Sequence, residues 1–337
     1  MNGNDNEMRD QRAMMEGLYW WGVPTLLRCP HNADPAASDI ALVGVPHSTG
    51  NGTTERDQHL GPRAVRNMSA IARRVHLAFG FSPWECCRVC DMGDVPLPEG
   101  NNNELSIARI AAFYAAIAAA GARPVSIGGD HSITGGIISG LCDGGAALAG
   151  GRKIALLHLD AHTDTFHNLP HFLGAKKSAA HWGSYLVQEG RVDASKSVQL
   201  GIRGNPRTLE WLNTSRELGY QIITKEEYDA RGHDACMAAA RERLGDSPVY
   251  ITFDLDCLDP AAAPAAANIE AGADGFRVSQ ATAILQSVRG LNIVGGDVVC
   301  LVPTKDSPNK ITAMVAAAMM FELTALIADK HHRPAAA

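Results

Sequence analysis

Acidic and imidazole side chains follow three of the most apolar segments of the chain at short, regular spacing. GGDHS at 128–132 follows the run PVSI, DAHTDT at 160–165 follows IALLHL, and DLD at 254–256 follows VYITF. Alternate side chains of an extended segment share one face, so Asp160, His162 and Asp164 are expected to converge, as are Asp254 and Asp256.

Carboxylates and imidazoles crowded at one place would repel each other and lose hydration unless cations neutralised them. The three motifs therefore predict a divalent metal site. Mixed carboxylate and imidazole ligands without thiolate are typical of Mn2+, Fe2+, Co2+, Ni2+ or Zn2+.

Each motif also has a purely structural interpretation. GGDHS alone can be a turn from strand to helix in which Asp or Ser caps the helix, and DLD alone can be a pair of loop carboxylates. DAHTDT is more specific, because a buried strand has no structural use for three ionisable groups on one face. Taken together, each after an apolar run, the three motifs favour the metal site.

The segments that must position these residues alternate between two kinds. Apolar, β-branched runs predict strands at 40–45, 124–127, 154–159, 198–202, 249–253 and 292–295. Alanine-rich stretches at helical spacing predict helices at 105–120, 206–218, 234–244, 278–288 and 309–328, and a helix of small residues follows GGDHS. Strand alternating with helix predicts a parallel sheet covered on both faces, with ligands at the carboxyl ends of its strands.

The same pattern predicts a single catalytic domain over residues 39–330. The first 38 residues, which include Trp20, Trp21, Pro24 and Cys29, fit no strand-helix-strand unit and are expected to form an arm that packs on the domain or on another subunit. Residues 331–337 are expected to be a flexible tail.

Composition excludes several classes of function. The net charge of -6 disfavours nucleic acid and anionic membrane as partners, because counterion release and surface attraction would both be lacking. The chain has no uninterrupted run of about 18 apolar residues, and its first residues are too polar for a signal peptide. Its eight scattered cysteines do not suggest a disulfide framework. We therefore expect a cytoplasmic protein that binds neither nucleic acid nor membrane.

The motifs as a set resemble the ureohydrolase superfamily, which includes arginases, agmatinases, guanidinobutyrases, guanidine hydrolases and metformin hydrolase. The resemblance covers almost the whole chain and is carried by VGVP at 43–46, GPRAVR at 61–66, DMGDV at 91–95, GGDHS, LDAHTDT, LGIR at 200–203 and FDLDCLDP at 253–260. It implies a three-layer α/β/α fold around an eight-stranded parallel sheet, and a trimer or hexamer with or without a paralogous subunit.

The resemblance also implies two divalent metal ions, Ni2+ or Mn2+, at six ligand positions that are all filled here. One ion would be held by His131, Asp160, Asp164 and Asp254, and the other by His162, Asp160, Asp254 and Asp256. A hydroxide shared by the two cations would attack the guanidinium carbon. Asp164 would pass the proton to the departing amine.

The sequence departs from the family around the expected substrate. Most relatives have a D-V-V-E-x-x-P pattern whose Glu pairs with the guanidinium, but here Cys300 takes that place. The loop A-P-G-T-G-T-P is replaced by residues 263–269 with three consecutive alanines, which predicts a more apolar pocket wall. We predict substrate contacts at Cys300, Asn268 and Glu270. The family's His-Gly pair after Asp164 is absent, and His181 is our first choice for its catalytic role, followed by His171 and His167.

These features favour hydrolysis of a substituted guanidine or biguanide, such as metformin to guanylurea and dimethylamine, and metformin hydrolase is the branch that the chain resembles most. Loss of the Glu removes charge-assisted hydrogen bonds worth ~1.5 to 3 kcal/mol, and a substrate with delocalised charge loses less. One alternative is an agmatinase or guanidinobutyrase that releases urea and finds its anchoring charge at Glu270 or Asp306. Another is a catalytically silent partner of an active paralogue, which six intact metal ligands disfavour.

Overall fold

The computed structural model describes residues 11, 14–16, 18–51, 56–145, 148–167, 174–206 and 208–332. Within them, one eight-stranded sheet of parallel strands runs in the order β2-β1-β3-β8-β7-β4-β5-β6. The strands are β1 Ile40–Val45, β2 Val89–Asp94, β3 Arg123–Gly128, β4 Ala155–Leu159, β5 Val198–Ile202, β6 Gln221–Thr224, β7 Val249–Asp254 and β8 Ile293–Val299. The predicted three-layer fold with an eight-stranded parallel sheet is confirmed.

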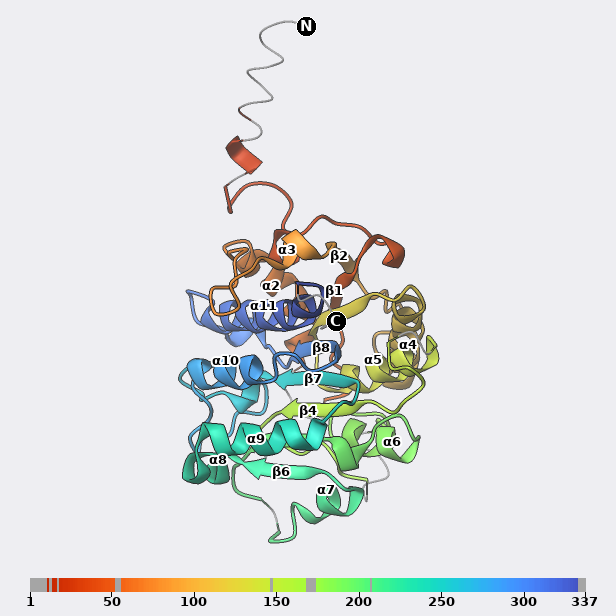
Figure 1. Ribbon diagram of the computed structural model, residues 1–337, viewed down its shortest axis with the longest axis vertical. Helices are drawn as coiled ribbons and strands as arrows, with labels where there is room; N and C mark the ends of the chain where they lie inside the picture. Colours follow the sequence, from red (N-terminus) through yellow and green to blue (C-terminus); the bar gives the residue numbers. More distant parts are fainter. Residues whose placement is uncertain are drawn as a thin grey trace, which may run out of the picture.

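Helices cover both faces of the sheet (Figure 1). One face carries α2 Gly61–Ser69, α8 Lys225–Arg231, α9 His233–Leu244, α10 Val278–Ser287 and α11 Ile311–His332, and the other carries α4 Asn103–Ala119, α5 Ser132–Asp143 and α6 Trp182–Gln188. The shorter elements are helices α3 Pro83–Cys86 and α7 Asn213–Leu218 and the 3-10 turns η1 Leu26–Arg28, η2 Pro35–Ala37, η3 Asp57–Leu60, η4 Ala194–Lys196, η5 Leu255–Cys257 and η6 Pro303–Lys305.

The six predicted strands are present, and two strands were not predicted. β2 and β6 are the two outer strands of the sheet, where one side is not covered by a neighbour. Their sequences, VCDMGD and QIIT, are short or interrupted by charge, because an edge strand needs less apolar surface than a central one. The helix predicted at 206–218 begins only at Asn213, since Leu209 before it is exposed and has no core to pack on.

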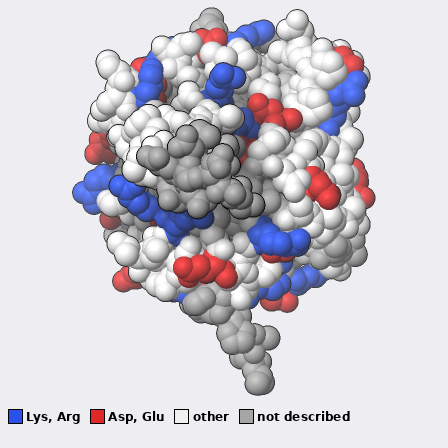
Figure 2. Space-filling model, turned by 90° about the horizontal axis from the view of Figure 1, so that it is seen from above, with Lys and Arg blue, Asp and Glu red and all other residues white. Residues whose placement is uncertain are grey.

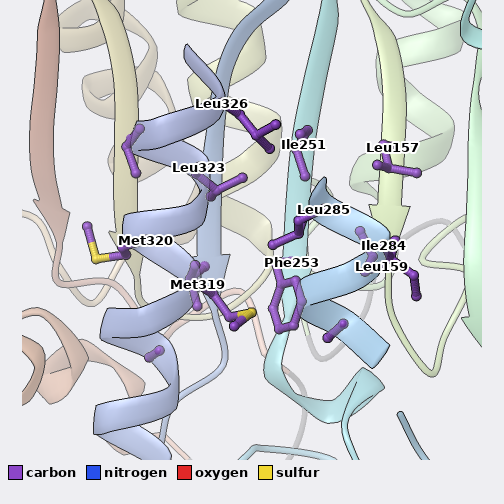
Figure 3. Packing of buried hydrophobic residues seen from close by; sticks show 14 of the residues in the cluster. Leu157, Leu159, Ile251, Phe253, Ile284, Leu285, Met319, Met320, Leu323 and Leu326 are labelled. Carbon is purple, nitrogen blue, oxygen red and sulfur yellow. The ribbon is translucent and has the colours of Figure 1, made fainter. Parts of the chain in front are cut away.

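The core on the α11 face joins two strands and two helices (Figure 3). Side chains of β4 and β7 meet those of α10 and α11, among them Leu157, Leu159, Ile251, Phe253, Ile284, Leu285, Met319, Met320, Leu323 and Leu326. Gly296 of β8 allows this approach, because a Cβ there would lie 2.8 Å from the Ile251 carbonyl oxygen and 3.2 Å from Leu323. By length and composition α11 could cross a membrane, but 78% of that apolar window is buried inside the domain, as expected for a core helix.

Two of the motifs hold the chain's first segment on the domain. Asp91 of β2 accepts hydrogen bonds from the Arg66 side chain at 2.9 Å and from the Leu26 backbone N–H at 2.8 Å. Leu26 and Leu27 are buried, so residues 25–38 pack on the domain, whereas Trp20 is largely exposed. The domain boundaries at 39 and 330 stay predictions. Helix α11 runs to His332, and the rest of the predicted tail lies outside the described residues.

Acidic and basic side chains are interspersed on the face of the molecule that Figure 2 shows. Some surface charges of the described residues pair across elements, for example Arg191 with Asp143 at 2.7 Å and Arg88 with Asp39 at 2.7 Å. Exposed pairs of this kind contribute little to stability, about 0 to 1 kcal/mol each.

Candidate metal centre

The carboxyl ends of four adjacent strands, β3, β8, β7 and β4, meet at one edge of the sheet. His131 follows β3 and precedes α5, Asp160 follows β4, Asp254 ends β7, and Cys300 follows β8. In a parallel sheet this edge forms the crevice that binds ligands. The order of the strands therefore brings residues 120 or more positions apart in the chain into one site.

The six predicted metal ligands form one cluster. His131 Nδ1 lies 2.9 Å from Asp164 Oδ2, 3.0 Å from Asp160 Oδ2 and 3.1 Å from Asp254 Oδ2. His162 Nδ1 lies 3.0 Å from Asp256 Oδ2 and 3.4 Å from Asp160 Oδ1. Asp160 thus faces both imidazoles, one through each of its oxygens.

The residues converge for a different reason from the one we predicted. β4 ends at Leu159, so Asp160 to Asp164 are not on an extended strand, and Asp164 has a left-handed backbone with φ 50°. The Asp164 carbonyl accepts the Gly183 N–H at 3.0 Å, and a Cβ at Gly183 would lie 2.9 Å from that oxygen. The expectation of period-two alternation was wrong, and a turn fixed by α6 aims Asp164 instead.

The second carboxylate pair also lies on a turn. After Asp254 the chain enters the 3-10 turn η5, and Asp254 Oδ1 accepts the Asp256 N–H at 2.9 Å. Asp256 Oδ1 in turn accepts the Ala161 N–H at 3.0 Å. The second bond joins the loop after β7 to the loop after β4, and both bonds order the carboxylates through backbone donors.

Hydrogen bonding fixes which ring nitrogen of His131 faces the carboxylates. Thr252 donates its hydroxyl to Asp297 at 2.6 Å, so it accepts from His131 Nε2–H at 2.9 Å. Asp297 is fully buried and also accepts from Thr134 and Tyr250, each at 2.8 Å. His131 Nδ1 is therefore the nitrogen without a hydrogen in the neutral ring.

The second imidazole has the same orientation with another partner. His162 Nε2 lies 3.2 Å from Glu270 Oε1, a carboxylate that can only accept, so Nδ1 again points at the aspartates. His131 Nδ1 and Asp256 Oδ2 are buried polar atoms without a hydrogen-bond partner among the described residues. Lone pairs of nitrogen and carboxylate oxygen that face each other need a cation between them, so these residues fit two divalent metals.

The pKa values of the metal-free chain agree with this arrangement. Burial opposes the charged form of His131, but Asp160, Asp164 and Asp254 outweigh it and hold its pKa well above 6.5. Burial, followed by the charges of Asp254 and Asp160, raises the pKa of Asp256 well above its usual range. Protons therefore occupy the places that metal ions would take.

We expect the stabilisation by metal to increase with pH. The raised pKa values of His131 and His162 mean that the metal-free fold is stabilised by protonated imidazoles below about pH 6.5 and loses this contribution as the pH rises through the raised values. Bound metal displaces those protons, so it replaces the lost contribution. The melting temperature with and without Mn2+, measured from about pH 6 to about pH 9, should diverge as the pH rises. A difference that shrinks over this range would contradict the assignment.

Two further residues touch the ligands and were not predicted. The Gln199 amide donates to His158 Nδ1 at 3.3 Å and to the Thr163 carbonyl, so His158 Nε2 donates to Asp160 Oδ2 at 2.7 Å. The Trp182 indole donates to Asp164 Oδ2 at 2.8 Å. His158 therefore holds a ligand without being one. The sequence signal for His158 was its position as an ionisable residue inside the apolar run IALLHL.

The predicted substrate contacts are only partly brought together. Cys300 is buried and has a φ of 71°, and its Sγ lies within 4.8 Å of ligand atoms of His131 and Asp254. Glu270 contacts His162, and Asn268 is half-buried with φ 55°. His181 is buried beside Trp182 with Nδ1 2.7 Å from Ser178 Oγ.

The other candidates lie elsewhere. His167 is exposed on a turn, and His171 lies outside the described residues. Asp306 accepts the backbone N–H groups of Ser307, Thr312 and Ala313, so it caps α11 and cannot anchor a substrate. A hollow of about 310 Å³ between α8 and α10 and one of about 240 Å³ near Arg152 and Arg191 lie at residues other than the metal ligands.

Known proteins resemble this chain in sequence and architecture. The sequence profile of the arginase family matches residues 38–325. Guanidinopropionase from Pseudomonas aeruginosa is 38% identical over 320 residues, which cover 93% of this chain and 94% of that protein. Mitochondrial agmatinase from Gallus gallus is 35% identical over 311 residues, which cover 91% and 86%. The structure of proclavaminate amidino hydrolase from Streptomyces clavuligerus matches with a TM-score of 0.82 at 28% identity over 93% of this chain and 99% of that chain.

Proposed function

This chain belongs to the arginase family, and we propose that it hydrolyses a carbon–nitrogen bond of an N-alkylated, charge-delocalised guanidine, with the biguanide metformin as the leading candidate. Its membership confirms the predicted ureohydrolase superfamily, whose enzymes are hydrolases of guanidino compounds. The closer likeness to metformin hydrolase stays a prediction.

The relatives leave the rest of the substrate open. Guanidinopropionase and agmatinase are named for compounds that share the guanidino group but carry tails of opposite charge. Both substrates are compatible with the candidate metal centre, which would act on the shared guanidino group. The residues that meet the rest of the substrate must therefore be judged in this chain itself.

Cys300 is the observation that carries the proposal. Burial, followed by the charges of Asp254 and Asp256, raises the pKa of its thiol well above the usual range, so the thiol is neutral. A neutral thiol cannot pair with a compact guanidinium as a carboxylate does. It is better matched to a cation whose charge is spread over several nitrogens and whose alkyl groups accept a soft apolar neighbour.

The alanine loop is hydrogen-bonded to the backbone around Cys300. The Ala267 N–H donates to the Cys300 carbonyl at 2.8 Å, and the Val302 N–H donates to the Ala265 carbonyl at 2.8 Å. Ala265, Ala266 and Ala267 are at most 2% exposed, so they do not line an open wall as we expected from the sequence. They are buried apolar neighbours of the backbone around Cys300, and Ala267 belongs to the same apolar cluster as Cys300.

The bound cations and Asp164 would have separate roles in the reaction. Bound divalent cations supply Lewis acidity and an activated water. Water adds to the guanidinium carbon, the bond to the departing nitrogen breaks, and that nitrogen takes a proton, which for metformin gives guanylurea and dimethylamine. Asp164 is 8% exposed, more than Asp160 and Asp254, and its Oδ2 is held by the Trp182 indole, so it is placed to carry this proton.

The test is release of product from purified protein loaded with Ni2+ or Mn2+. Dimethylamine and urea should be measured in parallel with metformin, guanidine, arginine, agmatine, guanidinobutyrate and guanidinopropionate. We expect the highest kcat/KM for metformin. A clear preference for guanidinopropionate or agmatine would overturn the proposal for the substrate but not the assignment of the metal centre.

A guanidino acid or agmatine is the second candidate substrate, favoured by the names of the relatives. Hydrolysis of such a substrate would release urea and no dimethylamine. A silent subunit is disfavoured, because a retired site would have no reason to keep burying four carboxylates around two imidazoles. We also propose a trimer or hexamer, which sedimentation of the purified protein with and without a paralogous chain would test.

A further inference from the structure

The two imidazoles of the metal centre are held by chemically different partners. His131 Nε2 donates to the neutral hydroxyl of Thr252 at 2.9 Å, whereas His162 Nε2 donates to the carboxylate of Glu270 at 3.2 Å. A carboxylate behind a ligating imidazole makes the ring a stronger donor and fixes its orientation. A hydroxyl that itself donates elsewhere does this less strongly.

The loop after β5 leaves room for the Glu270 carboxylate. Gly204 has φ 91°, and a Cβ at this position would lie 2.3 Å from Glu270 Oε2 and 2.5 Å from its Cδ. Only a glycine therefore admits the carboxylate here, between the 204 backbone and the His162 ring. The placement is built from two loops, one after β5 and one after β7.

The surroundings explain why His162 needs such a partner. Its side chain is 31% exposed, whereas that of His131 is 2% exposed and packs on the tilted ring of Trp182 at a centroid distance of 4.8 Å. Packing therefore holds the His131 ring. The more exposed His162 ring depends on its hydrogen bond for orientation.

We propose that Glu270 is a positioning residue that sets the affinity of the second metal, the one nearest His162 and Asp256. It keeps Nδ1 of His162 directed at Asp256 and Asp160. This inference rests on the proposed function in requiring two bound cations. This role differs from that of a substrate contact, which stays a prediction for Glu270, because Glu270 Oε1 accepts from His162 Nε2.

The experiment titrates the metal-free full chain with Mn2+ alone. The parent, Glu270→Gln and Glu270→Ala are compared by equilibrium dialysis with elemental analysis and by electron paramagnetic resonance, which distinguishes a coupled pair from isolated ions. We expect Glu270→Ala to raise the dissociation constant of the second Mn2+ by about 10- to 100-fold and Glu270→Gln to raise it less. The first Mn2+ should bind within about twofold of the parent, so that at intermediate Mn2+ the coupled signal gives way to an isolated one.

Glu227→Gln is the matched control, because Glu227 pairs with Arg231 on the outer helix α8 and its loss changes the net charge equally. It should bind two Mn2+ like the parent. The metal-free melting temperature of each variant shows whether the fold is intact, which the half-exposed Glu270 leads us to expect.

Three outcomes would overturn the inference. If Glu270→Ala binds both Mn2+ ions like the parent, Glu270 does not position the metal. If it binds both but raises KM alone, Glu270 is a substrate contact. If the parent itself binds no Mn2+ pair, the inference fails, whereas the proposed function is judged separately by product release from the Ni2+-loaded protein.

Discussion

Replacing Asp254 with alanine should remove both metal ions and lower turnover by about 10⁴-fold or more, because the chemistry loses several kcal/mol of charge stabilisation. Asp254 faces His131 Nδ1 at 3.1 Å and aligns Asp256 through its backbone N–H, so it touches ligands of both cations. Elemental analysis after dialysis and a product-release assay check the two parts of this expectation.

The fold should survive the same substitution. Asp254 is one of the four buried carboxylates of the candidate metal centre, and burial with Asp160 beside it raises its pKa in the metal-free chain. Removing it relieves repulsion, so the metal-free variant should melt at or above the temperature of the metal-free parent. The parent alone should gain stability from metal, roughly 2.7 kcal/mol at a hundredfold excess over the dissociation constant.

Asp246→Ala is the control for Asp254→Ala. Asp246 lies on the surface beside Arg152, with its side chain 96% exposed, so its loss removes a carboxylate without touching the site. This variant should keep both metals and full activity. An Asp254→Ala protein that held two ions at the parental rate would show that Asp254 does not bridge them.

The central strands could be predicted because they are buried on both faces and so are apolar along most of their length. β1 and β5 begin and end where the pattern places them, while β2 and β6 were missed because edge strands carry charge or are too short to stand out. Sequence patterns report burial, and the edges of a sheet are where burial is incomplete.

The clustering of the carboxylates and imidazoles could also be predicted, but the turns that aim them could not. Asp164 depends on a left-handed backbone that Gly183 of a separate helix stabilises, which no local spacing indicates. The same is true of the residues behind the ligands. Thr252 and Trp182 are unremarkable in the sequence and acquire their roles only because the strand order and α6 place them beside His131 and Asp164.

Restoring the family's carboxylate with Cys300→Glu should reverse the substrate preference. Position 300 is 2% exposed and lies next to Asp254, so a new carboxylate would be desolvated beside like charges. We expect kcat/KM for metformin to fall by about tenfold or more, equivalent to about 1.4 kcal/mol of transition-state binding, and that for guanidinopropionate or agmatine to rise. The φ of 71° at position 300 strains cysteine and glutamate alike, so it does not affect the comparison of the parent with Cys300→Glu.

Cys300→Ala separates charge from size in this test. Alanine is neutral, so this variant should keep the order of substrates even if it lowers every rate, whereas Cys300→Glu should change the order. Metal content must be measured in both, because Cys300 lies within 4.8 Å of ligand atoms of His131 and Asp254 and metal loss would lower all rates together.

If Cys300→Ala changes the order of substrates as Cys300→Glu does, the thiol acts by its shape and not by its lack of charge. If the parent already prefers guanidinopropionate or agmatine to metformin, the argument from Cys300 is wrong, and the anchoring group for those substrates must be sought among the residues around Asn268 and His181.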